Sequence, residues 1–515
     1  MTVLVNWIER TRGFGLKNAA LALVLLTVVT RLPALIHPRA IDDEAIYAVV
    51  ADEIVDGGKP YRDAIERKPP LLFWTYAGVF RVMGKYNWPA LHLFALGWTL
   101  ATMAGLYQAA KQLWDREAGL AAALLYSVFG SYATWKNLAF NGEMMMNLPL
   151  AWAWAIGMRQ APSRVRAELL VAGGLLGAAF LLKQPAAIAA LPLGLYLLLP
   201  SYRRSRGVSF ASAVGQAAML TLGFAGVLGL VAAILQHQGI LGEAFHWTVS
   251  DHSVPYVFWN HALTATAIFV VSCAPLLVGT ALACRKLWEC WVGKSAEQTA
   301  LIGWLVVSAV GVAAGGRFYP HYYLQLLPPL ALLAAPALSD LWRKKLATTP
   351  EMWRFAVTWW TWLGVTALVF LLLQWWELAS RREPSSAGRY LAAHAGLVDR
   401  VFVWGQQPEI YLDAHCRPAS RFVATFPLTG YVFGGTVPGL NTQDRIVPGA
   451  WESWQRYMKA HPPAYVVDTQ TDRDALYPVR NFPKLAELLT KDYSETFRTP
   501  TSVIYRRKGV ATSGN

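Results

Sequence analysis

The sequence predicts a mainly α-helical, polytopic membrane protein with a smaller soluble α/β domain at its C-terminal end. Hydrophobic residues make up 55% of its 515 residues and charged residues only 15%, a balance outside that of ordinary soluble proteins. Apolar runs of about 17 to 25 residues, long enough to cross a bilayer, recur up to about residue 380. We therefore expect a transmembrane domain at residues 1–380 and a soluble domain at residues 381–515.

Hydropathy predicts about eleven transmembrane helices. Arg10, Arg12 and Lys17 precede the first apolar run without a small-residue cleavage site, so this run is expected to remain as a membrane anchor. The predicted spans are residues 17–36, 88–110, 118–135, 144–158, 168–183, 185–200, 212–235, 260–283, 298–315, 323–340 and 355–377.

The basic residues between these spans predict the orientation of the chain. Cytoplasmic loops are rich in lysine and arginine, and a cytoplasmic N-terminus makes every inner loop basic. The apolar stretch Leu71–Met83 is too short to span, so we interpret it as an interfacial helix on the outer surface. The first outer loop, residues 37–85, then shares the outer compartment with the soluble domain. The inner basic residues are Lys111 and Arg116; Arg159, Arg164 and Arg166; Arg203, Arg204 and Arg206; Arg285, Lys286 and Lys294; and Arg343, Lys344, Lys345 and Arg354.

The formal net charge of +14 follows from this topology. Because the excess lysine and arginine lies in short clusters between apolar runs, the expected partner is the lipid bilayer, and a nucleic acid is not expected. The four cysteines, Cys273, Cys284, Cys290 and Cys416, show neither a disulfide framework nor the close spacing of a metal site.

The first outer loop contains an acidic run, Asp42-Asp43-Glu44, at the start of a segment with apolar residues at helical spacing. Gly57-Gly58 ends that segment, which predicts a short helix lying on the membrane surface. Acidic residues at this position either cap the helix and complement its dipole or take part in chemistry. Both interpretations remain open on the pattern alone, and Asp42 is the better candidate for the cap.

A basic pair follows in the same loop, at Arg67-Lys68-Pro69-Pro70. Proline is common in the first turn of a helix, so a second interfacial helix is expected to begin here. The lysine beside it either contacts lipid headgroups or binds a phosphate at the water–lipid boundary.

Three further outer turns contain polar side chains. They are Asn141-Gly142-Glu143, Lys183-Gln184-Pro185, and the turn from Gly315 to Tyr323, which contains Arg317, His321 and Tyr322. Each of them alone is typical of a polar hairpin or of an aromatic belt at the membrane surface. The topology places them on the same side of the membrane as the acidic run.

The C-terminal region predicts a small α/β domain. Val398–Trp404 and Ala464–Val467 have the pattern of strands, and Gly449–Ala460 and Lys484–Leu489 that of helices. Arg381–Gly388, rich in serine, proline and charge, is the expected linker. This region shows no catalytic triad and no cluster of metal ligands.

Together, the outer-loop motifs resemble a known family. Asp43-Glu44-Ala45-Ile46-Tyr47, Gly58-Lys59-Pro60-Tyr61-Arg62-Asp63 and Lys68-Pro69-Pro70, in this order, are similar to the first periplasmic loop of GT-C fold glycosyltransferases related to protein O-mannosyltransferases and aminoarabinose transferases. Further matches cover nearly the whole chain: Asn141-Gly142-Glu143-Met144, the turn from Arg317 to Tyr323 with Leu327-Pro328-Pro329, and Val403-Trp404-Gly405 through Pro408-Glu409-Ile410-Tyr411.

The resemblance implies a bacterial inner-membrane enzyme. It would transfer one sugar, with inversion, from an undecaprenyl-phosphate-type donor to a lipid, glycan or protein acceptor of the envelope in the periplasm. Asp43 matches the functional aspartate, with Glu44 its neighbour, and Lys68 matches the basic residue near the donor phosphate. Aminoarabinose transferases have an arginine where this chain has Ile46, so neither aminoarabinose nor lipid A is implied. The other expected substrate-binding residues are Tyr47, Tyr61, Glu143, Lys183, Arg317, His321 and Tyr322.

An inverting transfer needs a base for the incoming hydroxyl and stabilisation of the departing phosphate. We assign Asp43 as base or orienting group, Glu44 as its partner, and Lys68 with Arg317 as phosphate stabilisers. The sequence identifies no cofactor, although two carboxylates could bind a divalent cation. The alternatives are a transporter or lipid flippase, a structural envelope protein, and a glycan ligase or polymerase that transfers a preformed chain.

Overall fold

The computed structural model describes residues 16–159, 164–250, 257–289, 296–343, 350–380, 383–396, 398–433, 436, 440–471 and 475–509. The predictions that rest on Arg10, Arg12, Cys290, Lys294, Lys344, Lys345 and Arg381 lie outside these residues. The chain forms two compact units. The first comprises Met1–Arg39, His92–Val231 and Trp259–Arg381, and the second comprises Ala40–Leu91, Ala232–Phe258 and Arg382–Asn515.

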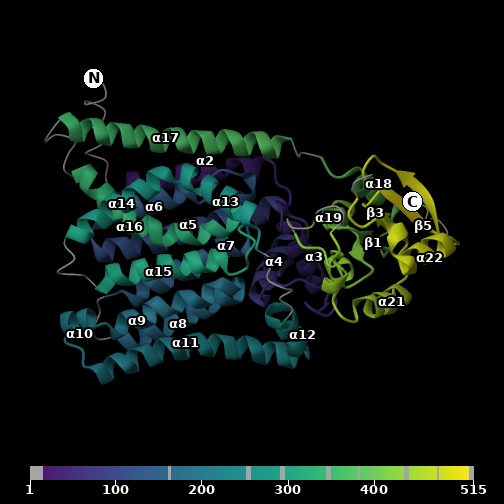
Figure 1. Ribbon diagram of the computed structural model, residues 1–515, viewed down its shortest axis with the longest axis horizontal. Helices are drawn as coiled ribbons and strands as arrows, with labels where there is room; N and C mark the ends of the chain where they lie inside the picture. The colour runs from purple at the N-terminus through teal and green to yellow at the C-terminus, as the bar shows by residue number, and fades with distance from the viewer. Residues whose placement is uncertain are drawn as a thin grey trace. The chain divides into compact units, whose positions relative to one another are not determined.

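The first unit is a bundle of long apolar helices, several of which run alongside one another (Figure 1). Its core is built by the inward faces of these helices, whereas many outward leucine and valine side chains stay exposed, as expected for a surface that meets lipid. The helices are α2 (Leu16–Ile36), α5 (Trp88–Leu113), α6 (Arg116–Phe129), α7 (Gly142–Gly157), α8 (Val165–Leu182), α9 (Ala190–Leu198), α10 (Pro200–Arg206), α11 (Phe210–His237), α13 (Trp259–Ser272), α14 (Ala274–Glu289), α15 (Ala296–Ala313), α16 (Leu327–Arg343) and α17 (Pro350–Ala379).

Seven helices in the described part of the chain are long and apolar enough to cross a membrane, or nine if each of two bent pairs is one span. The predicted number of eleven is therefore not confirmed. The bent pairs are α9 with α10, at 54°, and α13 with α14, at 73°. Pro200 is the first residue of α10 and Pro275 the second residue of α14, and proline removes a backbone hydrogen-bond donor, so it is tolerated in the first turn of a helix but not in a helix that continues through it.

The two remaining predicted spans correspond to α6 and α7, which have only 14 and 16 residues. The C-terminal end of the predicted span 118–135 is wrong, because α6 ends at Phe129 and a separate 3₁₀ turn, Trp135–Leu138, follows. Three turns of this kind flank the bundle helices, the others being Gln184–Ala189 and Pro320–Leu326.

The second unit combines the first outer loop with the C-terminal α/β region. The loop contributes α3 (Glu44–Val55) and α4 (Pro70–Met83), both predicted, and α4 is not among the helices long enough to span. A five-stranded sheet has the order β2-β1-β3-β5-β4, in which β1 is parallel to β2 and β3, and β5 is antiparallel to β3 and β4. The other elements are α12 (Leu241–Phe245), a π-helix (His246–Ser250), α18 (Ser386–His394), β1 (Arg400–Trp404), α19 (Glu409–Ala414), β2 (Arg417–Pro418), α20 (Phe426–Thr429), α21 (Ala450–Ala460), β3 (Tyr465–Asp468), α22 (Pro483–Asp492), β4 (Tyr493–Arg498) and β5 (Val503–Arg507).

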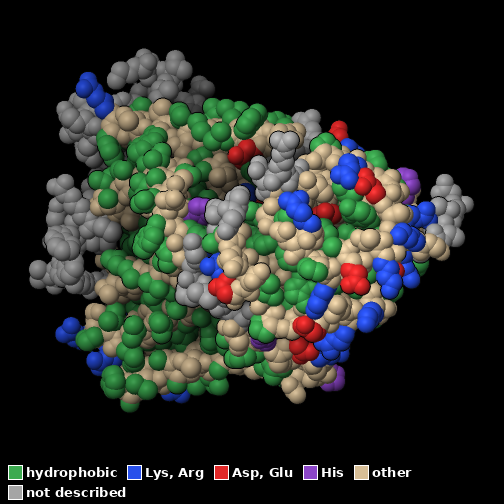
Figure 2. Space-filling model, turned by 45° about the vertical axis from the view of Figure 1, so that its right-hand side comes forward, with side chains coloured by type: hydrophobic (Ala, Val, Ile, Leu, Met, Phe, Trp, Pro, Cys, Tyr) green, Lys and Arg blue, Asp and Glu red, His purple; other side chains and the backbone are tan. Residues whose placement is uncertain are grey.

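The elements predicted for the C-terminal region are confirmed as β1, β3, α21 and α22. The hairpin of β4 and β5 was not predicted. The expected linker is too long by three residues, because α18 begins at Ser386. The hydroxyl of Ser385 accepts a hydrogen bond from the backbone N–H of Gly388 and so caps that helix. Figure 2 shows hydrophobic side chains over the helices of the first unit and charged side chains gathered on the second.

Helices α8 and α11 approach closely because glycines face each other. A Cβ added to Gly223 would lie 2.0 Å from the carbonyl oxygen of Leu170, and one added to Gly173 would lie 1.9 Å from that of Leu220. Small residues allow helix backbones to pack tightly in membranes, where close van der Waals contact drives association.

We expect Gly223→Ala to lower the stability of the purified protein, by about 1–3 kcal/mol, because α8 and α11 must separate to admit the methyl group. Gly226→Ala is the matched control on the same helix, because a Cβ at Gly226 meets nothing within 4 Å. Thermal unfolding in detergent compares the two variants. Equal melting temperatures for both would contradict the close packing of α8 on α11.

Candidate functional site

The acidic run forms the turn that enters α3. Asp43 occupies the N-cap position without a side-chain capping bond, so the prediction that Asp42 is the cap is wrong. Asp42 instead adopts a left-handed conformation, with φ of 52°, which aspartate tolerates better than most residues. Glu44, fully buried, closes the turn: its Oε2 accepts the backbone N–H of Ile41 at 2.8 Å. Glu44 therefore holds the backbone that positions its two neighbours.

The carboxylate of Asp43 is oriented by Tyr47, one helical turn later. The Tyr47 hydroxyl donates a hydrogen bond to Asp43 Oδ2 at 3.0 Å. The ring of Tyr47 is fully buried and packs edge-on against Phe73 and Tyr76 of α4, at centroid distances of 6.2 and 5.8 Å. Asp43 itself is half-buried, so one side of its carboxylate is fixed while access remains.

Lys68 approaches the same tyrosine from the start of α4. Its Nζ lies 5.8 Å from the centroid of the Tyr47 ring and 3.3 Å from Oε1 of Glu66. The side chain of Lys68 is 20% exposed and that of Glu66 is 8% exposed. A cation over an aromatic face is favourable, more so when it is partly desolvated. Asp43, Tyr47 and Lys68 thus form one cluster, which we call the Tyr47 cluster.

Tyr61 supports this cluster through the backbone of Lys68. Its hydroxyl donates to the backbone oxygen of Lys68 at 2.8 Å, and its ring is fully buried. Burial, reinforced by the charge of Glu66, raises the pKa of Tyr61 well above its ordinary value. Burial together with Glu44 and Asp43 does the same for Tyr76. Both phenols stay protonated at neutral pH, and that of Tyr61 is the donor of the bond to Lys68.

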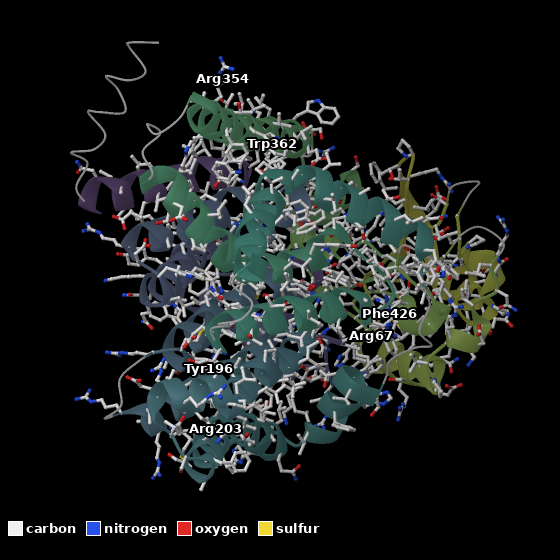
Figure 3. The ribbon with its side chains drawn as sticks, turned by 60° about the vertical axis from the view of Figure 1, so that its left-hand side comes forward. Arg67, Tyr196, Arg203, Arg354, Trp362 and Phe426 are labelled. Carbon is white, nitrogen blue, oxygen red and sulfur yellow. The ribbon has the colours of Figure 1, made fainter. Side chains whose placement is uncertain are left out.

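The neighbouring Arg67 points elsewhere. Its guanidinium lies 4.4 Å from the centroid of the Phe426 ring, at the start of α20 (Figure 3). Lys68 of the predicted basic pair contacts the Tyr47 ring, and Arg67 contacts the Phe426 ring.

The first unit contains a second group of predicted residues. Lys183 Nζ lies 2.8 Å from Glu143 Oε1, and their side chains are only 8% and 2% exposed. Lys183 also lies over the ring of Tyr322, 5.0 Å from its centroid. The close fit requires glycine at position 142, because a Cβ there would lie 2.8 Å from Lys183 Cδ.

His321 and Arg317 belong to the same turn as Tyr322. His321 is buried between Tyr319 and Tyr322, with ring centroids 5.7 and 4.9 Å away. Arg317 is half-buried, and within the described residues its guanidinium has no ion-pair or hydrogen-bond partner. Gly316 and Phe318 on either side of it have positive φ values of 64° and 50°, which shape the turn that presents it.

Comparisons with known proteins identify similar glycosyltransferases. Residues 67–229 match the family model described as dolichyl-phosphate-mannose-protein mannosyltransferase. An undecaprenyl phosphate-alpha-4-amino-4-deoxy-L-arabinose arabinosyl transferase from Pseudomonas savastanoi pv. phaseolicola is 25% identical over 382 residues, which cover 70% of this chain and 68% of that protein.

Solved structures agree in fold. ArnT from Cupriavidus metallidurans bound to undecaprenyl phosphate superposes with a TM-score of 0.64 at 16% identity, over 97% of this chain and 100% of that one. The archaeal oligosaccharyltransferase AglB from Archaeoglobus fulgidus, in complex with an inhibitory peptide and a dolichol-phosphate, superposes with a TM-score of 0.51 at 13% identity. The match covers 96% of this chain and 74% of that one. The family-model match, the curated relative and the solved structures together support a GT-C glycosyltransferase of the aminoarabinose transferase-like family. The resemblance predicted from the outer-loop motifs is confirmed.

The structure of this glycosyltransferase also contains a buried charge that sequence inspection missed. Arg31 lies inside the first span, is 3% exposed, and donates to the backbone oxygen of Leu138 at 2.6 Å. Its position in the sequence could have indicated its importance, because ionisable residues within membrane spans are rare and often functional. Tyr76 and Glu66, which surround the Tyr47 cluster, were missed because their relevance follows from packing.

The described residues of the glycosyltransferase contain no group of three or more His, Cys, Asp or Glu side chains that could bind a metal ion. A divalent cation remains a hypothesis for which Asp43 and Glu44 would be the ligands. The buried position of Glu44 and its bond to the Ile41 amide leave that carboxylate engaged in the backbone turn.

We expect Glu143→Gln to destabilise the glycosyltransferase by about 3–5 kcal/mol, because the buried Lys183 charge loses its partner. Glu143→Gln combined with Lys183→Met removes both charges and should recover most of this loss. Thermal unfolding of the purified protein measures both variants. A stable double variant without transferase activity would assign the pair to substrate binding; an unaltered melting temperature in the single variant would contradict the pairing.

Proposed function

We propose that this glycosyltransferase moves a single sugar from a polyprenyl-phosphate donor to an envelope acceptor, with inversion at the anomeric carbon. The observation that carries the proposal is the Tyr47 cluster, in which an oriented carboxylate and a cation contact the same tyrosine. The relatives support the donor class, since their names or bound ligands specify undecaprenyl phosphate or dolichol-phosphate. They do not favour a transporter, a flippase or a structural envelope protein.

In the proposed reaction the acceptor hydroxyl attacks the anomeric carbon of the donor sugar. The bond from that carbon to the phosphate oxygen breaks, and its electron pair leaves with the polyprenyl phosphate. Asp43 orients the hydroxyl and takes its proton. The hydrogen bond from Tyr47 keeps one oxygen of Asp43 in place.

The departing phosphate gains negative charge, which Lys68 is placed to stabilise. Tyr61 fixes the backbone of Lys68, so the ammonium group is held by the fold as well as by Glu66. Arg317 is the second proposed phosphate ligand, because a half-buried guanidinium without an anionic partner among the described residues favours an anionic ligand. Glu44 is a positioning residue in this scheme.

The remaining predicted residues complete the proposal. Glu143, Lys183, His321 and Tyr322 form a compact polar and aromatic group that suits the hydroxyl groups and ring of a sugar. A glycan ligase or polymerase remains the enzymatic alternative, and it differs in transferring a preformed chain.

We expect Asp43→Asn to reduce sugar transfer by about a hundredfold or more, because the amide keeps the shape but cannot act as a base. Mass spectrometry of envelope lipids, glycans and proteins from cells with and without the gene first identifies the acceptor through a mass difference of one sugar. A difference of several sugars would favour the ligase alternative. The gene-deleted cells are then complemented with the wild-type gene or with a variant, and the amount of sugar on the acceptor gives the transfer activity of each protein.

Asp42→Asn is the matched control for this experiment, because asparagine tolerates the left-handed conformation and the same charge is removed one residue away. It should retain transfer, whereas Lys68→Gln should lose it. Wild-type transfer by Asp43→Asn would show that this carboxylate is not the base.

We also propose that the N-terminus lies in the cytoplasm of a bacterium and the C-terminal domain in the periplasm, as the basic inner loops favour. Alkaline phosphatase, which is active only in the periplasm, should be active when fused after Ser385 and inactive when fused after Arg206. The opposite pattern would reverse the orientation.

A further inference from the structure

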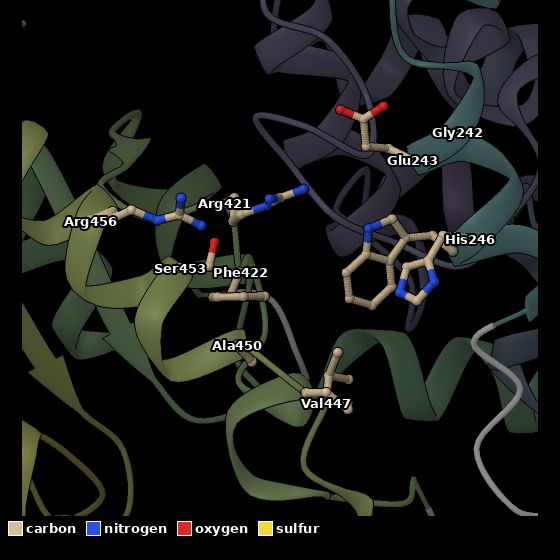
Figure 4. A pocket seen from close by; sticks show the side chains of 12 residues that line it. Gly242, Glu243, His246, Arg421, Phe422, Val447, Ala450, Ser453 and Arg456 are labelled. Carbon is tan, nitrogen blue, oxygen red and sulfur yellow. The ribbon is translucent and has the colours of Figure 1, made fainter.

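The second unit contains an open groove of about 540 Å³ that the proposed chemistry does not use (Figure 4). Arg421 and Arg456 lie on one side of it and Glu243 of α12 on the other, while Trp247, Phe422 and Val447 supply apolar surface. All these residues belong to the same compact unit.

Arg421 is held in place without a direct ion pair among the described residues. Its guanidinium donates to the backbone oxygen of Tyr61 and lies 5.8 Å from the centroid of the Tyr457 ring, but its buried Nε has no hydrogen-bond partner. Burial is the largest influence on the pKa of Arg421 and lowers it; Arg456 adds to this effect, whereas Tyr457, Glu243 and Asp63 oppose it. Within the described residues, Arg456 itself has no ion-pair partner.

The start of helix α21 adds further donors to the same side. Gly449, with φ of 74°, occupies its N-cap position and offers no side-chain cap. Ser453 is 93% buried, and its hydroxyl has no hydrogen-bond partner. Figure 4 shows that hydroxyl directed toward the space between Arg421 and Arg456. The amide groups and positive dipole end of a helix N-terminus favour an anion.

Glu243 on the opposite side is paired with Arg62 at 2.6 Å. Burial raises the pKa of Glu243, but its hydrogen bonds and the charges of Arg62 and Arg421 together lower it overall. Glu243 is thus shared between Arg62, which it contacts directly, and Arg421. The groove therefore keeps a positive side, formed by Arg421, Arg456 and the start of α21.

We propose that this groove is a binding site for a phosphate group on the acceptor, presented on a sugar or a lipid headgroup. Two guanidinium groups, a helix N-terminus and a hydroxyl without a partner match the charge and the acceptor oxygens of a phosphate monoester. This inference rests on the proposed function, because it assigns the groove to the acceptor of that reaction.

The groove is joined to the proposed catalytic loop by Tyr61. The backbone oxygen of Tyr61 accepts the hydrogen bond from Arg421, and its hydroxyl donates to the backbone of Lys68. The backbone oxygen of Arg421 in turn accepts the N–H of Ile65 at 2.9 Å. One tyrosine thus connects the arginine of the groove to the lysine proposed for the donor phosphate.

The test measures binding to the purified full-length protein, with glucose 1-phosphate as the soluble probe and glucose as its neutral counterpart. Arg456→Gln removes an exposed guanidinium without breaking an ion pair, so the fold should be retained. We expect this variant to weaken glucose 1-phosphate binding by about tenfold, the usual effect of losing one hydrogen bond to a charged group. Lys459→Gln is the matched control, because it removes an exposed positive charge from the same helix outside the groove.

A second arm distinguishes the source of the phosphate. Binding of the protein to vesicles of phosphatidylcholine with phosphatidic acid is compared with binding to phosphatidylcholine alone, for the same variants. Dependence on Arg456 in the sugar arm assigns the groove to a phosphorylated glycan, and dependence in the vesicle arm assigns it to a lipid headgroup. Independence in both arms, equal binding of glucose, or an equal loss in Lys459→Gln overturns the site.

The same measurement on Asp43→Asn separates this inference from the proposed chemistry. That variant should bind the phosphate probe as the wild type does, because Asp43 does not line the groove. Loss of phosphate binding in Arg456→Gln with normal sugar transfer in Asp43→Asn would refute the proposed base and leave the groove intact.

Discussion

The buried ring of Tyr47 is the contact on which the proposed chemistry depends. Here the Tyr47 hydroxyl holds Asp43 and the face of the same ring attracts Lys68. Because the ring is fixed between Phe73 and Tyr76, it sets the positions of both charged groups from a rigid apolar base.

The short helices of the outer loop supply that base. Helix α3 provides Asp43 and Tyr47 one turn apart, and α4 provides the aromatic surface and, just before its first turn, Lys68. Neither helix is long enough to span a bilayer. Their packing against each other buries the apolar faces that would otherwise need lipid, so a polar cluster can form at the ends of the two helices.

The sequence predicted features that depend on local patterns, but it did not predict features that depend on tertiary packing. Both outer-loop helices, four elements of the C-terminal domain and the positions of Asp43 and Lys68 followed from periodicity, proline placement and motif order. The roles of Asp42 and Glu44 could not be predicted from these signals. Asp42 adopts a left-handed conformation, the N-cap is Asp43, and the backbone N–H of Ile41 donates to the carboxylate of Glu44. Hydropathy also cannot detect that α13 and α14 bend by 73°, since both halves are apolar.

The cations of this structure differ in whether a carboxylate of the protein compensates their charge. Lys183 with Glu143, and Arg62 with Glu243, are paired at 2.8 and 2.6 Å, so each cation is satisfied without a substrate. Arg317 and Arg456 have no such partner among the described residues. Maintaining an unneutralised cation near other positive groups costs free energy, because like charges repel. A polyprenyl phosphate or a phosphorylated acceptor would relieve that cost on binding, which gives both proposed anion sites the same physical basis.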